Sequence, residues 1–167
     1  MPTTVKIPLD LLTVQVNSAN AFWTAKSGTN IDQSYIAFVD SGDGVAWYWG
    51  YIPNNVATSP LWNLDFYHST NIGSGGNAIV SIYARAASNT STIDVAPTLL
   101  VSSGSIAVNS ANQMTISAAS GANFDSVVAV SATNYLFVKC LRHAGTSGDT
   151  LNDQWNLASM VMRIDLT

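Results

Sequence analysis

Short apolar segments separated by turn residues run along the whole chain, and their composition predicts strands. Five prolines and eleven glycines punctuate segments rich in Val, Ile, Tyr, Phe and Trp, the residues that favour β-structure. The stronger predicted strands are residues 21–25, 35–40, 45–52, 62–67, 78–86, 113–118, 135–142 and 159–166. Weaker candidates are residues 3–8, 98–102 and 127–130.

The last strong segment alternates cleanly between its two faces. Met160, Met162 and Ile164 point one way, and Arg163 and Asp165 point the other. Such alternation indicates one buried face and one wetter face. Eight or more strands at this spacing predict an all-β fold, an antiparallel β-sandwich of jelly-roll type with a short N-terminal arm.

The N-terminal segment permits two interpretations. Residues 1–16 are expected to be an arm or an edge strand, and residues 17–167 a single β-sandwich domain. Candidates for contact with a neighbouring subunit or a capsid are the apolar side chains Val5, Ile7, Leu9, Leu11 and Leu12. The alternative is that they belong to the first edge strand of the sandwich. Helical structure is expected only at residues 9–16 and 152–157.

Charge is scarce in this chain. It contains no glutamate, and Asp and Lys+Arg number ten and six among 167 residues, so 10% is charged against roughly 25% in an average domain. Between Arg85 and Lys139 the only charged side chains are Asp94 and Asp125. Because burying unpaired charge is costly, this scarcity predicts that residues 86–138 meet other subunits or a shell in an assembly.

The charge pattern and the motifs argue against several function classes. A net charge of −4 without a basic cluster argues against nucleic-acid binding. No apolar run approaches the roughly 18 residues that span a bilayer, so no membrane partner is expected. No G-x-S-x-G motif supports a hydrolase, and no glycine-rich phosphate loop precedes a helix. We therefore expect a protein that is not an enzyme and that binds no cofactor.

Metal binding also has little support. His68 and His143 have no second ligand in register, and structural roles are expected for both. Residues 40–44, with the sequence DSGDG, resemble part of a calcium loop but lack its closing glutamate. A hairpin turn between the flanking strands is the favoured interpretation, and no metal site is expected.

Aromatic residues concentrate in the first half of the chain. Because aromatic faces can stack on sugar rings, the candidate glycan-stacking residues are Trp47, Trp49, Tyr51 and Trp62. Polar neighbours that could bind hydroxyls are Asn54, Asn55, Asn63 and Asp65. The alternative is that the rings fill the core and the contacts between subunits, where Trp and Tyr are enriched.

The last third of the chain carries a recognisable arrangement of segments. It contains FVKCLRHA at residues 137–144, GDT at 148–150, Asp153, and the closing strand VMRI at 161–164. This arrangement resembles the ending of small jelly-roll virion proteins of tailed bacteriophages. The resemblance implies a trimeric capsid decoration (cement) protein that stabilises a phage head. Such a protein is made in the host cytoplasm, lies on the virion surface, and has copies of itself and the major capsid protein as partners.

Two other functions remain open at this point. One is a carbohydrate-binding or receptor-binding β-sandwich, such as the tip of a tail fibre or spike, and the other is a single-jelly-roll capsid protein. In each of these functions, an ion pair of Arg142 with Asp149 or Asp153 is expected to pin the loop before the last strand. That role is structural.

Overall fold

The structure, a computed structural model, describes residues 3–14, 20–26, 33–56, 62–70, 75–88, 94–109, 113–119 and 135–167. Within these residues the chain forms strands and no helix, which confirms the predicted all-β class. The strands are β1 (Thr3–Val14), β2 (Ala21–Lys26), β3 (Gln33–Phe38), β4 (Gly44–Tyr51), β5 (Trp62–Thr70), β6 (Gly76–Ala87), β7 (Thr98–Val108), β8 (Thr115–Ala119), β9 (Tyr135–Arg142) and β10 (Trp155–Leu166).

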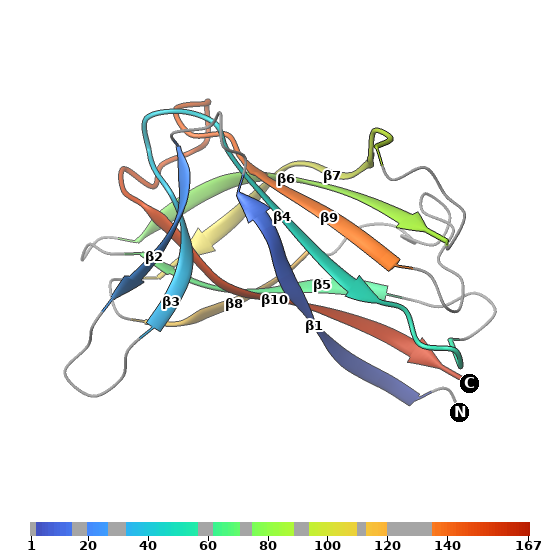
Figure 1. Ribbon diagram of the computed structural model, residues 1–167. Helices are drawn as coiled ribbons and strands as arrows, with labels where there is room; N and C mark the ends of the chain where they lie inside the picture. Colours follow the sequence, from blue (N-terminus) through green and yellow to red (C-terminus); the bar gives the residue numbers. More distant parts are fainter. Residues whose placement is uncertain are drawn as a thin grey trace.

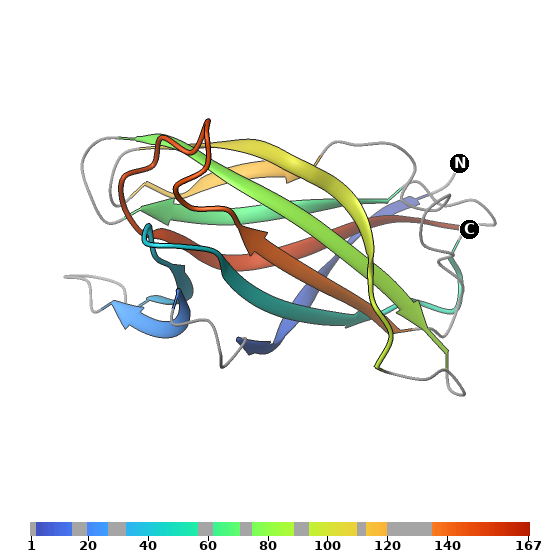
Figure 2. The same cartoon turned by 90° about the horizontal axis from the view of Figure 1, so that it is seen from above.

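The strands form two antiparallel layers that face each other (Figure 1). In the first sheet, β10 pairs with β5 along one side, and β5 pairs with β8. On its other side β10 pairs with β3 and with the first half of β1, and β3 pairs with β2. The second sheet has the order β1–β4–β9–β6–β7. Seen from above, the strands of the two layers cross at an angle (Figure 2).

Strand β1 belongs to both sheets. Residues 3–9 pair with β10 in the first sheet, and residues 10–14 pair with β4 in the second. The register shifts between Leu11 and Thr13, which makes Leu12 the extra residue of a bulge. The expectation of a helix at residues 9–16 is therefore wrong for its described part. A bulge displaces the alternation by one position, and the displaced pattern imitates helical spacing.

The first strand is not a free arm. Leu9 is 5% exposed and lies in the core, and Val5, Ile7 and Leu11 pack against that core. The structure does not describe the side chain of Leu12. Val5, Ile7, Leu9 and Leu11, four of the five apolar candidates for gripping a capsid, thus pack in or against the core of their own molecule. Their alternation along a strand with an apolar inner face explains this placement.

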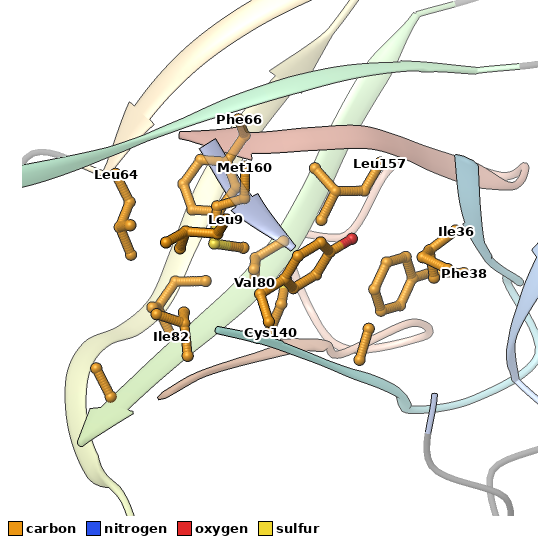
Figure 3. Close-up of a cluster of buried hydrophobic side chains, with 14 of the residues drawn as sticks. Leu9, Ile36, Phe38, Leu64, Phe66, Val80, Ile82, Cys140, Leu157 and Met160 are labelled. Atoms are coloured by element: carbon orange, nitrogen blue, oxygen red, sulfur yellow. The ribbon is translucent and has the colours of Figure 1, made fainter. Parts of the chain in front are cut away.

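The core fills the space between the layers (Figure 3). Phe66 of β5 and Met160 of β10 point from the first sheet toward Val80 of β6 and Cys140 of β9 in the second, with Leu9 among them. The predicted buried face of the last strand is confirmed, since Met160, Met162 and Ile164 are each 0% exposed. The strand also begins earlier than expected. Residues 155–157, where a helix was expected, pair with β3 and β5.

The DSGDG turn at residues 40–44 does not close a hairpin. Its flanking strands lie in different sheets, because β3 pairs with β2 and β10 whereas β4 pairs with β1 and β9. The turn therefore carries the chain from the first sheet to the second. The expected hairpin is wrong because strands that follow each other in the sequence were assumed to be neighbours in one sheet.

Candidate functional site: an aromatic face on the second sheet

Strand β4 presents three aromatic rings on its outer side. Ala46, Tyr48 and Ile52 lie in the core, so alternate positions of the strand point away from it. These outward positions carry Trp47, Trp49 and Tyr51. Both tryptophans are half-buried, and Tyr51 is 44% exposed. The strand thus supplies the core with one face and offers rings to solvent with the other.

The neighbouring strands extend this surface. On strand β9, Lys139, Phe137 and Tyr135 lie directly opposite Trp47, Trp49 and Tyr51, respectively. On strand β6, Tyr83 lies opposite Lys139 and Arg85 lies opposite Phe137. Residues that pair directly across antiparallel strands share one face of the sheet. We call this surface the aromatic platform, and its residues are Trp47, Trp49, Tyr51, Tyr83, Arg85, Tyr135, Phe137 and Lys139.

Contacts among the rings define the geometry of the platform. The Tyr135 ring lies 5.6 Å from Trp49 at an interplanar angle of 37°, and 5.6 Å from Tyr51 edge to face at 69°. The Tyr51 hydroxyl donates a hydrogen bond of 3.1 Å to Asn54 Oδ1. Such aromatic pairs contribute about 0.5–1.5 kcal/mol beyond the area they bury, so the rings support one another in place. The end of β4 therefore carries a pre-ordered group of rings with an amide beside it.

Charged groups lie on both sides of the platform. Lys139 Nζ lies 5.0 Å from the centre of the Tyr83 ring, a cation–π contact. Arg85 occupies the next outward position of β6. On the other side of β4, the exposed Asp10 of β1 pairs with Trp49. The row of Trp49 and Phe137 thus runs between Asp10 on β1 and Arg85 on β6, whereas Lys139 lies inside the neighbouring row.

A second polar group lies at the end of this face, beyond β9. The Ser81 hydroxyl lies 2.8 Å from His143 Nε2, and Asp43 Oδ2 lies 3.3 Å from His143 Nδ1. These three residue types in this order are those of a Ser–His–Asp triad. Sequence reasoning missed the group, because its members lie far apart in the chain and no local motif connects them.

The environment of Ser81 does not suit nucleophilic attack. Ser81 is 3% exposed and lies within β6, with β7 and β9 on either side. The segment after His143 covers this end of β6, because Asp149 Oδ2 accepts a hydrogen bond from Ile79 N and Asn77 O accepts one from Thr150 N. A substrate carbonyl would have to displace this segment to reach the hydroxyl. The group is best described as a polar link between β6, β9 and the turn before β4.

Arg142 organises the same segment from the core side. It continues the inward row of β9 after Leu136, Val138 and Cys140, and its side chain is fully buried. Nη1 donates to the carbonyls of Phe38 and Asp153, and Nη2 donates to Asp40 Oδ1 and to the carbonyl of Leu151; their distances lie between 2.7 and 3.1 Å. Arg142 also forms an ion pair with Asp149.

The two residues expected near Arg142 take different positions. Asp149 accepts hydrogen bonds from the guanidinium through both carboxylate oxygens, at 3.0 and 3.2 Å. Asp153 contributes its backbone carbonyl, whereas its carboxylate accepts a hydrogen bond of 2.7 Å from the Thr70 hydroxyl. Arg142 therefore ties the segment before β10 to the end of β3 as well as to β9.

His68 and Cys140 are two of the buried groups outside the platform that have strongly shifted pKa values. His68 is 0% exposed, and burial lowers its pKa from 6.5 to about 4. Its Nε2 lies 2.9 Å from the Ser117 hydroxyl, and its ring packs near Trp155. Burial raises the pKa of the Cys140 thiol well above its usual range. Neither group faces the platform.

The His, Cys, Asp and Glu side chains of the described residues form no group of three or more that could hold a metal ion. In the same part of the chain, no helix is long and apolar enough to cross a membrane.

The structure brings together three of the four residues singled out for glycan stacking. Trp47, Trp49 and Tyr51 share the platform, whereas Trp62 begins β5 in the first sheet, and its side chain is not among those described. Asp65 is 5% exposed and binds Arg163, so it is not a polar neighbour of the platform. Sequence reasoning missed the contributions of β6 and β9. The alternation of Tyr135, Phe137 and Lys139 was visible in the sequence, but the pairing of β9 with β4 was not.

Comparison with known proteins relates this fold to solved structures. No protein-family model and no curated protein sequence matches the chain. The isomalto-dextranase of Arthrobacter globiformis T6, solved in complex with panose, superposes with a TM-score of 0.55 at 10% identity, over 95% of this chain and 23% of that one. The C-terminal CBM6 of LamC, a marine laminarinase from Zobellia galactanivorans, covers 96% of this chain and 98% of its own at 14% identity and a TM-score of 0.49. The structure of infectious bursal disease virus strain Gx gives 8% identity and a TM-score of 0.44, over 99% of this chain and 32% of that one. At these identities the likeness concerns the β-sandwich fold alone.

Proposed function

We propose that this protein is a carbohydrate-binding β-sandwich module without catalytic activity, and that its aromatic platform is the binding surface. The observation that carries the proposal is the set of aromatic side chains on the outer face of β4, β9 and β6, three adjacent strands of one sheet. Sugar rings have apolar C–H faces that stack on aromatic rings, while their hydroxyls need polar partners. The platform offers both, with Asn54 and Asp10 beside the rings.

Rigid strands suit such a surface. A site built on strands holds its side chains more precisely than a site on loops. The contacts of Tyr135 with Trp49 and Tyr51 order the rings before a ligand arrives, which lowers the entropic cost of binding. The related fold of an isomalto-dextranase solved with panose is compatible with this function, although the likeness itself concerns the fold.

A binding assay with paired variants tests this proposal. Affinity electrophoresis against a panel of neutral and acidic polysaccharides should retard the wild-type protein in at least one gel. The Trp47→Ala/Trp49→Ala variant should lose this retardation, because it removes two of the aromatic rings on which a sugar would stack. The matched control is Trp23→Ala, since Trp23 of β2 is 57% exposed but lies away from the platform.

The electrophoresis assay has three outcomes, and each bears differently on the proposal. Retardation that Trp47→Ala/Trp49→Ala abolishes and Trp23→Ala leaves intact supports the platform as the binding surface. Retardation that survives the double substitution would place the site elsewhere. A wild-type protein that no polysaccharide of the panel retards would overturn the proposed function.

A virion structural role is the second candidate, and a separate surface favours it. Four large apolar side chains between residues 86 and 138 are exposed by 41–61%: Val95, Leu99, Met114 and Ile116. Leu99 lies on β7 and Ile116 on β8, which are the last strands of the two sheets on the same side of the sandwich. An apolar edge with little charge suits contact with further copies of the chain, as a trimeric capsid decoration protein requires.

Oligomeric state tests this second candidate. Light scattering at micromolar concentration should report a trimer, and Ile116→Asp should convert it to a monomer because the new carboxylate would be buried at the interface. Lys6→Asp, on the outer face of the first sheet, is the control and should leave the trimer intact. A wild-type protein that stays monomeric would remove this candidate without affecting the carbohydrate-binding proposal.

A further inference from the structure

We infer that the glycan recognised by the aromatic platform is acidic, an inference that rests on the proposed carbohydrate-binding function. The chain has six Lys+Arg in all and a net charge of −4. Two of these six cations, Lys139 and Arg85, nevertheless lie on the platform, on adjacent strands. A protein this poor in positive charge places a third of its cations on the face that carries the aromatic platform.

The other described cationic side chains are placed differently. Arg142 points into the core between the sheets, and Arg163 of β10 lies in the first sheet. Lys6 of β1 pairs with Arg163 of β10 on the outer face of the first sheet, away from the platform. Among the cations whose side chains the structure describes, Lys139 and Arg85 are therefore the two that a ligand on the platform would meet.

Lys139 has the geometry of a carboxylate-binding group inside an aromatic row. It pairs with Trp47 of β4 on one side and with Tyr83 of β6 on the other. Its Nζ lies 5.0 Å from the centre of the Tyr83 ring, so the ammonium is held along the face of the sheet. A pyranose ring stacked on Trp47 would bring a carboxylate on its C5 carbon toward this ammonium. Opposite charges at such a short distance attract each other.

Arg85 extends the positive region by one row. It occupies the outward position next to Tyr83 on β6 and pairs with Phe137 of β9. Its guanidinium carries a permanent positive charge, which attracts a carboxylate. Asp10 lies on the opposite side of the platform, beside Trp49, so the two cations define a positive side and Asp10 a negative one. This polarity would orient a chain of uronic acids with its carboxylates toward β9 and β6.

Two forms of one polysaccharide test the inference. Polygalacturonate and its methyl-esterified form share the same backbone of pyranose rings and differ in charge. At about 50 mM NaCl the wild-type protein should bind the acid form at least about tenfold more tightly than the ester. The preference should shrink at about 500 mM NaCl, because exposed charges are then screened.

Variants locate the effect on the platform. Lys139→Gln/Arg85→Gln should bind both forms with the affinity that the wild-type protein has for the ester. Lys6→Gln, which removes one positive charge from the opposite face, should keep the full preference for the acid form. Urea unfolding curves of the variants will show whether the sheet remains intact. The single variant Lys139→Gln provides a second measurement of the preference for the acid form over the ester.

The outcomes distinguish a failure of the acidic-glycan inference from a failure of the proposed carbohydrate-binding function. Equal affinity for the acid and the ester, or a preference that the double variant retains, overturns the acidic-glycan inference and leaves carbohydrate binding in place. Binding to neutral polysaccharides alone does the same. If no polysaccharide of either charge is bound, the proposed function fails, and this inference fails with it.

Discussion

Arg142 and Asp149 form a bidentate ion pair in which both side chains are 0% exposed. The two bonds run from Nη2 to Oδ1 at 3.0 Å and from Nε to Oδ2 at 3.2 Å. Burying two charges is costly, but here the guanidinium meets further oxygen acceptors, and Asp149 also accepts a hydrogen bond from Ile79 N. The pair therefore closes one end of the sandwich with a fully bonded polar group.

Removing one partner of this pair should destabilise the protein strongly. Arg142→Met leaves the Asp149 carboxylate buried without its counter-charge, which should lower the free energy of unfolding by about 3–5 kcal/mol. The measurement is urea unfolding at neutral pH. Lys6→Met is the control, because Lys6 is exposed on the outer face of the first sheet and the expected loss is about 1 kcal/mol or less. Similar small losses for both variants would contradict the structural role of Arg142.

Stability should fall in acid because of His68. Burial lowers the pKa of His68 to about 4 in the folded protein, while the unfolded chain keeps the usual value of 6.5. Between these values the unfolded chain binds more protons, so the free energy of unfolding is highest above pH 6.5 and decreases as the pH falls toward 4. The contribution of this one group is about 3 kcal/mol.

The variant His68→Gln isolates this contribution. It keeps a polar group near the Ser117 hydroxyl but does not titrate, so its unfolding free energy should depend less on pH between about 6.5 and 4. Urea unfolding at several pH values measures the difference in slope. Parallel curves for the variant and the wild-type protein would show that His68 takes up its proton equally in both states.

Leu9 should behave as a core residue although it lies near the start of the chain. Leu9→Ala should cost about 2–5 kcal/mol of stability, because the side chain lies between the sheets and its removal leaves a cavity. Phe22→Ala is the control at a position of β2 that is 42% exposed, where we expect a loss below about 1 kcal/mol. Thermal and urea unfolding would both detect the contrast. Equal losses would mean that β1 packs less firmly than described.

The Cys140 thiol should be unreactive in the folded protein. It is fully buried, and burial raises its pKa, so the thiolate that attacks thiol reagents is scarce. Ellman's reagent should report no rapid reaction in buffer and one thiol per chain in concentrated guanidinium chloride. Rapid reaction of the native protein would show that β9 opens readily from the sheet.

The strand pattern was predictable because it depends on local alternation. The inner face of β10, with Met160, Met162 and Ile164, could be assigned from period-2 spacing alone. The course of β1 could not, because the bulge at Leu12 changes the phase of the alternation, and local spacing then resembles a helix. The prediction of a hairpin at residues 40–44 was wrong for another reason. Whether two successive strands pair is decided by the whole sheet order and not by the residues between them.

The candidate site also has a part that local sequence predicts and a part that depends on the pairing of distant strands. Trp47, Trp49 and Tyr51 could be placed on one face of a strand, since they alternate within eight residues of β4. Their neighbours Tyr135 and Lys139 are more than eighty positions away, and only the pairing of β4 with β9 brings them together. The Ser81–His143 contact likewise depends on β6 and β9 lying side by side. Pairings between distant segments carry the chemistry here, and single-sequence patterns do not contain them.

The shared strand β1 has a consequence for biosynthesis. Of the described strands, β1 leaves the ribosome first, whereas β10, its partner from Thr3 to Leu9, leaves last. Residues 3–9 of β1 therefore stay without this partner until β10 has been translated, whereas residues 10–14 can pair with β4 earlier. Pairings of such large sequence separation form slowly, and waiting apolar strands are prone to associate with one another. The nascent chain is therefore most prone to aggregation in the interval before β10 is available to pair with β1.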